Sequence, residues 1–215
     1  MIDLHTHSLF SDGELLPSEL VRRAEVIGYR ALAITDHADT SNLDWIIPRL
    51  IQVCQDLNTH GRVRAIPGIE LTHLPLALIV PLTSRARALG AKVVVMHGET
   101  IVEPVLPGTN HQAIQAGVDI LAHPGLISQK DVNLAREKGV FLEITSRQGH
   151  SLTNGHVARL ARKTGAPLVL NTDTHLPQDL ISREKALKVA LGAGLGSNDF
   201  EKMLENSWQI VSRLG

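Results

Sequence analysis

Two patterns of apolar residues alternate along the chain. Short, mostly apolar runs are typical of buried strands. They are separated by segments in which apolar residues recur every three or four positions, which is typical of helices. This alternation predicts βα units around a parallel sheet. Seven strands are predicted, at residues 2–5, 31–35, 63–71, 93–97, 120–123, 140–144 and 167–171.

The predicted helices have recognisable ends. Pro17 stands at a favourable first helical position, and Gly28 follows the last apolar residue of the same helix. A second helix is predicted at about residues 43–57. Four later helices should end at glycines that precede strands, namely Gly90, Gly117, Gly139 and Gly165. A last helix is predicted from an apolar face that consists of Phe200, Met203, Leu204, Trp208 and Val211.

Composition favours one globular domain with a small substrate. The 215 residues, 43% of them hydrophobic, suffice for a single well-buried domain over residues 1–215. The 21 Lys and Arg residues against 22 Asp and Glu leave a charge of −1, so neither a membrane nor a stable nucleic-acid complex is expected as partner. Without a bilayer-length apolar run or a signal sequence, a cytoplasmic location is expected, and the oligomeric state stays open. The one cysteine, Cys54, lies on an apolar stripe and is expected in the core.

Histidine is used unusually often: 11 occur, against three Phe, two Trp and one Tyr. His5 and His7 are two positions apart at the end of a predicted strand, so their side chains point to the same side and can face one ion. Asp12 follows in a segment of loop composition and can reach the same place, with a solvated turn aspartate as the alternative. This stretch suggests a metal site.

Metal-ligand residue types follow six of the seven predicted strands. A single histidine at a strand end is more often structural, but six coincidences at one face of a parallel α/β fold favour an active site there. The least regular segments, 72–82, 98–109 and 146–153, each follow a strand and are the candidate site loops. The residues at the strand ends are His5, His7, Asp12, Asp36, His37, Glu70, His97, Glu99, His123, Asp173 and His175.

These residues form an ordered series of motifs. The series is His-Thr-His with Ser-Asp-Gly at 5–13, Thr-Asp-His at 35–37, Gly-Ile-Glu at 68–70, His97, His-Pro at 123–124 and Asn-Thr-Asp-Thr-His at 171–175. Over essentially the whole chain it resembles the PHP (polymerase and histidinol phosphatase) family. The resemblance implies an α/β fold, a distorted seven-stranded (β/α)7 TIM-like barrel, with a trinuclear metal centre at the C-terminal face of the strands.

The resemblance also implies which residues hold the metals. Up to three divalent ions are expected, and mixed nitrogen and oxygen ligation suits Zn, Mn or Fe without choosing among them. Asp12 stands where some family members have histidine. Glu70, Asp173 and His175 are also expected to be catalytic. The implied ligand sets are His5, His7, Glu70 and Asp173 for the first metal, Glu70, His97 and His123 for the second, and Asp12, His37 and His175 for the third.

Residues outside the ligand motifs have weaker assignments. Asp3 and Asp36 are expected to orient neighbouring imidazoles, with turn capping as an equal alternative, and Glu99 is grouped with them as a supporting residue. Arg147, after the sixth strand, is the candidate for binding a phosphate, with a solvent-facing role as the alternative. The remaining histidines divide into candidate substrate-binding residues, His73 and His150, and surface residues, His60, His111 and His156. Glu143 also lies near a strand end, without an assigned role.

A charge count favours phosphate as the substrate. Three divalent ions with three carboxylates leave the site at about +3, which a metal-bridging hydroxide and a phosphate-monoester dianion would neutralise. The expected activity is therefore metal-dependent hydrolysis of a small phosphorylated substrate, with histidinol phosphate as the first candidate. The alternatives are a nucleotide or oligonucleotide phosphoesterase or exonuclease, and a non-catalytic metal-binding module. The general acid for the leaving group is left open.

Overall fold

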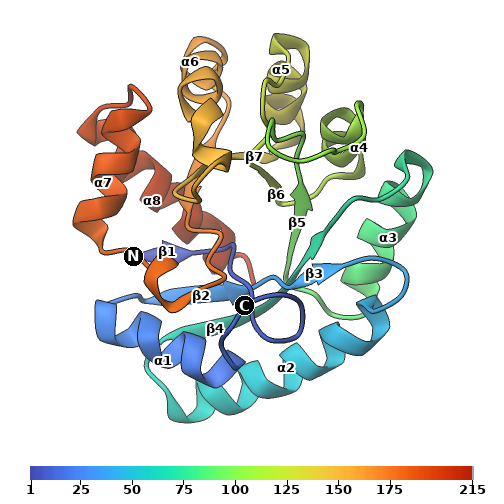
Figure 1. Ribbon diagram of the computed structural model, residues 1–215, viewed down its shortest axis with the longest axis vertical. Helices are drawn as coiled ribbons and strands as arrows, with labels where there is room; N and C mark the ends of the chain where they lie inside the picture. The colour runs from blue at the N-terminus through green and yellow to red at the C-terminus, as the bar shows by residue number, and fades with distance from the viewer. Residues whose placement is uncertain (215) are drawn as a thin grey trace.

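Seven parallel strands form the wall of a barrel in the computed structural model, which describes residues 1–214 (Figure 1). Each strand pairs in parallel with the next in the order β1-β2-β4-β5-β6-β7-β8. All seven predicted strands are present. Their bounds are Ile2–Asp3 (β1), Ala31–Ile34 (β2), Arg64–Leu71 (β4), Val93–His97 (β5), Ile120–Ala122 (β6), Phe141–Thr145 (β7) and Leu168–Asn171 (β8).

A short strand, β3 (His37–Ala38), was not predicted. The first half of β4 pairs with β2 and its second half with β3, where His37 is opposite Glu70. Two residues, Thr35 and Asp36, separate the two short strands. The chain therefore continues along the wall of the barrel after β2 and brings His37 beside Glu70.

The first and last strands meet only at their carboxyl ends. Thr6 and Thr174 form an isolated parallel bridge, and the amide of His7 donates to the carbonyl of Thr174 at 2.8 Å. Below this bridge the side chain of Asn171 accepts from the amide of Leu4 at 2.9 Å, in place of a backbone ladder. The barrel is nearly closed, as the predicted distorted seven-stranded barrel requires.

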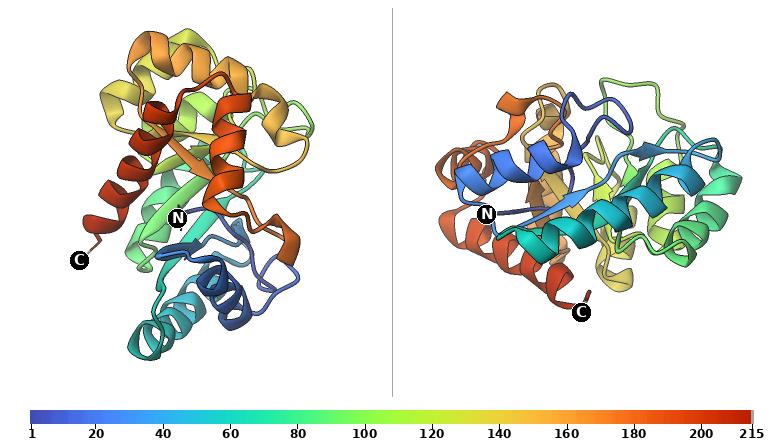
Figure 2. Two further views of the ribbon diagram at one scale, coloured as in Figure 1. Left: turned by 90° about the vertical axis from the view of Figure 1, so that its left-hand side faces the viewer. Right: turned by 90° about the horizontal axis from the view of Figure 1, so that it is seen from below.

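Eight α-helices pack around the strands (Figures 1 and 2). In the first, Leu20, Val21 and Ala24 are buried, and Gly28 ends the helix with a φ of 93°, a conformation that glycine adopts without strain. The predicted ends at Gly117, Gly139 and Gly165 are also confirmed. The helices are α1 (Pro17–Ile27), α2 (Leu43–His60), α3 (Leu76–Ala88), α4 (Thr109–Ala116), α5 (Gln129–Lys138), α6 (Asn154–Thr164), α7 (Arg183–Gly192) and α8 (Ser197–Ser212), with short 3₁₀ helices η1 (His150–Thr153) and η2 (Pro177–Asp179). None in the described part of the chain is long and apolar enough to cross a membrane.

One predicted loop is wrong. Residues 72–82 were expected to be irregular, but α3 begins at Leu76. Pro75 precedes the helix and Pro81 lies inside it, and these two prolines concealed its pattern. The helix forms because Ile79 and Leu82 are buried at helical spacing.

Two apolar cores hold the barrel together. The larger one lies between strands and helices and includes Cys54, whose thiol pKa is raised to about 12 by burial, so its predicted core position is confirmed. The smaller core includes Ile2, Val93 and Phe141, near the starts of the strands, with Ile210 of α8 packed against them. The amino-terminal end of the barrel is thus apolar, and the polar residues collect at the carboxyl end.

Candidate metal centre

The structure brings all nine predicted ligand residues together at the carboxyl ends of the strands. Seven are buried, His37 is partly buried, and the side chain of Asp12 is 58% exposed. They are His5 and His7 after β1, Asp12 in the loop before α1, His37 in β3, Glu70 in β4, His97 in β5, His123 after β6, and Asp173 and His175 after β8.

Glu70 lies at the centre of this group. Its Oε1 atom is 3.3 Å from both His5 Nε2 and His97 Nδ1, and its Oε2 atom is 2.6 Å from His37 Nδ1. Two ligands of one tetrahedral ion, each about 2.1 Å from it, are themselves about 3.4 Å apart. Oε1 therefore faces two imidazoles at a ligand-like spacing, whereas Oε2 is closer to His37 than two ligands of one ion would be. Glu70 thus has imidazoles at both of its oxygens, as a bridging carboxylate would.

Asp173, in the segment after β8, faces two further imidazoles of the group. Its Oδ1 atom is 3.2 Å from His7 Nε2, and its Oδ2 atom is 3.7 Å from His123 Nε2. Asp173 and His123 both have positive φ angles, 54° and 26°, which residues other than glycine rarely adopt. Such backbone strain is concentrated at functional sites, where the surrounding structure holds it.

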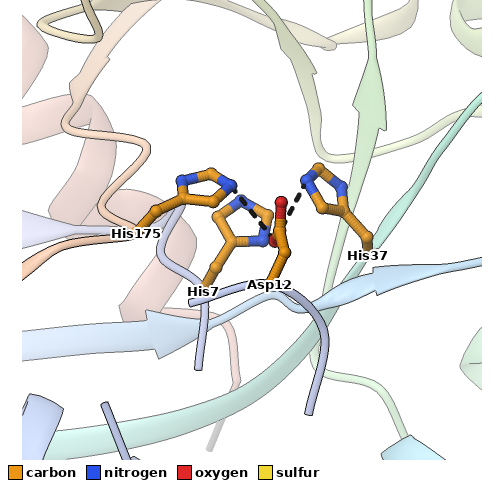
Figure 3. A group of neighbouring side chains, drawn as sticks. All are labelled: His7, Asp12, His37 and His175. Atoms are coloured by element: carbon orange, nitrogen blue, oxygen red, sulfur yellow. Dashed lines mark ion pairs between the residues drawn. The ribbon is translucent and has the colours of Figure 1, made fainter. Parts of the chain in front are cut away.

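A third group, His7, Asp12, His37 and His175, includes the exposed side chain of Asp12 (Figure 3). Asp12 Oδ1 is 3.2 Å from His175 Nε2 and 3.6 Å from His37 Nε2. The ring of His7 lies between these two histidines, with centroid distances of 4.2 Å to His37 and 4.1 Å to His175. His7, which was predicted as a ligand of the first metal, therefore also lies next to the predicted ligands of the third.

Buried polar atoms without partners indicate that cations belong here. Within residues 1–214, eight buried side-chain nitrogen and oxygen atoms lack a hydrogen-bond partner, and all belong to predicted ligands. Leaving such atoms unsatisfied costs about 1–3 kcal/mol each, a cost that bound ions remove. The donor set therefore fits metal ions. The atoms are His5 Nε2, both ring nitrogens of His7 and of His97, both carboxylate oxygens of Glu70, and His123 Nδ1.

The protonation states agree with metal ligation for part of the set. Burial is the largest influence on His7 and His123 and lowers the pKa of both well below the usual value, which leaves neutral imidazoles. Burial opposes ionisation of Glu70, yet His5, His37 and His97 hold its pKa well below the usual range. Burial also disfavours a charge on His5, but Glu143, Glu70 and Asp173 raise its pKa well above the usual value. A metal ion must displace that proton, so metal binding should release protons.

Glu143 is the carboxylate that orients an imidazole of the site. Its Oε1 atom accepts from His5 Nδ1 at 2.9 Å and from Asn171 Nδ2 at 2.8 Å, and its Oε2 atom accepts from the amide of His123 at 3.1 Å. Fixing the far nitrogen of a ligand histidine in this way sets which nitrogen faces the metal. Glu143 had no role assigned from the sequence. The signal was a lone acid in the apolar strand Phe-Leu-Glu-Ile-Thr.

The residues expected to orient imidazoles do something else. Asp3 accepts from the amides of His5 and Thr172 and from the Thr172 hydroxyl, so it ties β1 to the segment after β8. Asp36 accepts from the amides and hydroxyls of Ser8 and Ser11 and holds the loop that carries Asp12. These contacts match the turn-capping alternative and not the role of orienting imidazoles, because both carboxylates face neighbouring turns and bind backbone and hydroxyl groups there.

Glu99 also supports a loop instead of a ligand. Its Oε1 atom accepts from the amides of Gly108 and Asn110, at the start of α4. Asn110 returns the contact by accepting from the amide of Glu99 at 3.0 Å. Glu99 therefore fixes the conformation of the segment between β5 and α4.

A cavity of about 410 Å³ opens above the ligands. All three predicted substrate-binding residues, Arg147, His73 and His150, line it. The guanidinium of Arg147 donates to Asp179 at 3.0 Å, and Asp179 in turn accepts from the amide of His175 at 3.1 Å. Glu103, which was not singled out from the sequence, also lines the cavity.

The other three histidines lie outside the cavity. His60 is exposed at the end of α2, and His111 is 2.8 Å from Asp131 on the neighbouring helix. His156 is 2.8 Å from the carbonyl of Ile127.

Comparison with known proteins agrees with this geometry. Residues 3–83 match the PHP domain family. An uncharacterized protein of Methanocaldococcus jannaschii is 50% identical over 204 residues, which cover 94% of each chain. A probable phosphatase of Shewanella frigidimarina is 25% identical over an alignment of 246 positions, which spans 96% of this chain and 89% of the relative.

Solved structures share the fold at low sequence identity. A structure of archaeal ribonuclease P with mature tRNA contains a chain that is 15% identical and has a TM-score of 0.74, with coverage of 100% of this chain and 91% of that one. The histidinol phosphate phosphatase of Lactococcus lactis, solved with zinc, L-histidinol and phosphate, is 17% identical with a TM-score of 0.63, and 91% of this chain covers 94% of that one.

Proposed function

The chain belongs to the PHP family, and on this premise we propose that it is a metal-dependent phosphoesterase that acts in the cavity above Glu70. The observation that carries the proposal is the set of eight buried, unpartnered atoms that converge there from predicted ligands. The probable phosphatase among its relatives, and the neighbour of like fold whose structure holds zinc and phosphate, support the reaction class.

The proposed cofactor is three divalent ions. His5, His7, Glu70 and Asp173 would hold the first, Glu70 with His97 and His123 the second, and Asp12 with His37 and His175 the third. Glu70, Asp173 and His175 are the proposed catalytic residues. When bound, such ions lower the pKa of water and stabilise the negative charge that develops on phosphate.

The chain's own residues then orient the substrate. Arg147 uses one nitrogen on Asp179, which fixes its guanidinium at the cavity wall and leaves other N–H groups to donate to a phosphate oxygen. Because Asp179 also holds the amide of His175, the loops after β7 and β8 are joined at this point. Arg147 is the proposed phosphate-binding residue.

The structure changes the charge count made from the sequence. Glu143 on His5 and Glu103 in the cavity add two carboxylates, so three divalent ions would leave the site at about +1 instead of +3. Charge alone therefore no longer favours a phosphate-monoester dianion over a phosphodiester monoanion. Histidinol phosphate stays the first substrate to test, and nucleotides and short oligonucleotides are the alternatives.

The test is a substrate screen with metal-loaded protein. We expect hydrolysis of at least one of histidinol phosphate, nucleoside mono- and bisphosphates, and short oligonucleotides, with loss of activity after chelation. A fully metal-loaded protein that hydrolyses none of these would favour a non-catalytic metal-binding module instead.

A further inference from the structure

Three imidazoles converge on one carboxylate in the lining of the cavity. Glu103, in the segment between β5 and α4, has its Oε2 atom 3.1 Å from His73 Nε2 and 3.0 Å from His97 Nε2. Its Oε1 atom is 3.3 Å from His150 Nε2. The three histidines come from separate places, after β4, at the end of β5 and in η1, so the convergence is not a consequence of one local turn.

The distances fit a shared ion. Nitrogen and oxygen ligands about 2.1 Å from one metal are roughly 3.0 to 3.4 Å apart when the angle at the metal is between a right angle and tetrahedral. The lone pairs of the two ligand atoms then point to the metal, which lies to one side of the line between the atoms, and do not point at each other. His97 Nε2 has this arrangement: it is buried and has no hydrogen-bond partner within residues 1–214, although Glu103 Oε2 is only 3.0 Å away.

His97 has a free nitrogen for such an ion. Its Nδ1 atom faces Glu70, on the side of the proposed second metal, whereas its Nε2 atom faces Glu103 on the opposite side of the ring. The contact between Nδ1 and Glu70 Oε1 is 3.3 Å, again a ligand-like spacing. With an ion on each nitrogen, His97 would bridge the two as an imidazolate, so binding of the fourth ion must also release the remaining ring proton.

The flanking residues hold the group in place. His73 has a φ of 51°, a strained conformation for a residue with a side chain, and this places its ring 5.0 Å from that of His97. His150 is fixed by a contact of 2.7 Å between its Nδ1 atom and the hydroxyl of Thr100, and its Nε2 atom faces only one oxygen of Glu103. The other oxygen of Glu103 is left for the ion.

We propose that His73, His97 and Glu103 form a fourth divalent-cation site, separate from the three ions of the proposed function. The side chains of His73 and Glu103 are 41% and 35% exposed, so this ion exchanges with solvent more readily than the buried ones. With three protein ligands it keeps a position open for water or for an oxygen of a bound anion. The site does not depend on which ester the cavity accepts.

The test counts ions by equilibrium dialysis of the native protein against graded Mn²⁺, followed by elemental analysis. We expect the wild type to bind about one more ion per chain at high Mn²⁺ than Glu103→Gln or His73→Gln. Asp131→Asn is the matched control, because it changes a carboxylate that contacts a single histidine, His111, outside the cavity, and it should bind as the wild type does.

Two outcomes would overturn the fourth site. In one, both variants bind Mn²⁺ as the wild type does. In the other, only Glu103→Gln loses an ion, which would mean that Glu103 acts through His97 on the second metal, since His97 contacts Glu103 with one ring nitrogen and Glu70 with the other. Neither outcome bears on phosphoesterase activity, which is measured separately on the same preparations.

Discussion

His5 Nδ1 lies 2.9 Å from Glu143 Oε1, and both side chains are completely buried. The carboxylate also accepts from the side chain of Asn171 and from the amide of His123, so a single acid fixes two ligand segments and the last strand. This arrangement explains why the site can hold its geometry at the point where the barrel closes.

Glu143→Gln tests that role. The amide nitrogen of the introduced side chain would face one of three donors, and the charge that supports His5 would be lost. We expect metal affinity to fall by about 10- to 100-fold, the usual effect of losing a carboxylate behind a ligand histidine. Metal titration against a competing chelator measures it. Glu137→Gln, at an exposed position on α5, is the control, and equal affinities for the two variants would contradict the role.

Glu70→Gln should be the most damaging change to a single ligand. A carboxamide has one oxygen to offer where the carboxylate has two, and each oxygen of Glu70 faces a different imidazole. We expect the loss of at least two metal ions per chain, measured by elemental analysis after desalting. Full metal content with normal activity would show that Glu70 is not the bridge.

Arg147→Ala should lower kcat/KM for a phosphate ester by roughly 10- to 100-fold, the value of a charge-assisted hydrogen bond, with metal content unchanged. Arg22→Ala, which removes an exposed arginine paired with Glu25 on α1, should leave both quantities unchanged.

A second variant separates phosphate binding from a structural effect. Asp179→Asn removes the negative partner of Arg147 but leaves the guanidinium in the cavity wall. If Arg147 acts only by holding Asp179 and the His175 segment, Asp179→Asn should reproduce the full loss and should also lower metal content. In that case the assignment of Arg147 to phosphate is wrong.

Asp3 should make the stability of the metal-free protein fall as pH rises. Burial raises its pKa from 3.8 to about 6, so folding favours the protonated form. Asp3 therefore contributes about 3 kcal/mol to the free energy of unfolding. This contribution is fully present below about pH 4 and is lost as the pH rises through about 6. Asp3→Asn keeps an oxygen for the amides of His5 and Thr172 and should flatten this dependence. Urea unfolding between pH 4 and 7 measures the difference, with Asp56→Asn as control; parallel curves for wild type and Asp3→Asn would contradict the prediction.

The sequence was sufficient to place the strands, and to place the predicted ligand residues at one face, for one physical reason. Parallel strands place their carboxyl ends at one face, so a histidine or acid after each strand must lie near the others. The same reasoning located Arg147, which follows β7 and lines the cavity. Placing these residues from the strand ends required no knowledge of side-chain contacts.

The residues that were missed depend on such contacts. Glu143 lies within an apolar strand, and its role follows only when the strand's interior face and the position of His5 are known. Glu103 is in the irregular segment after β5, for which no periodicity rule exists. Asp3 and Asp36 were placed correctly at strand ends, but the sequence could not show that their partners are backbone amides and hydroxyls.

The metal content of the chain tests the central claim most directly. Protein purified anaerobically with added Zn²⁺, Mn²⁺ or Fe²⁺ and then desalted should retain about three divalent ions per chain by elemental analysis. Chelation should abolish phosphoesterase activity, and adding the ions back should restore it. Fewer than one ion per chain, with activity that survives chelation, would contradict the account.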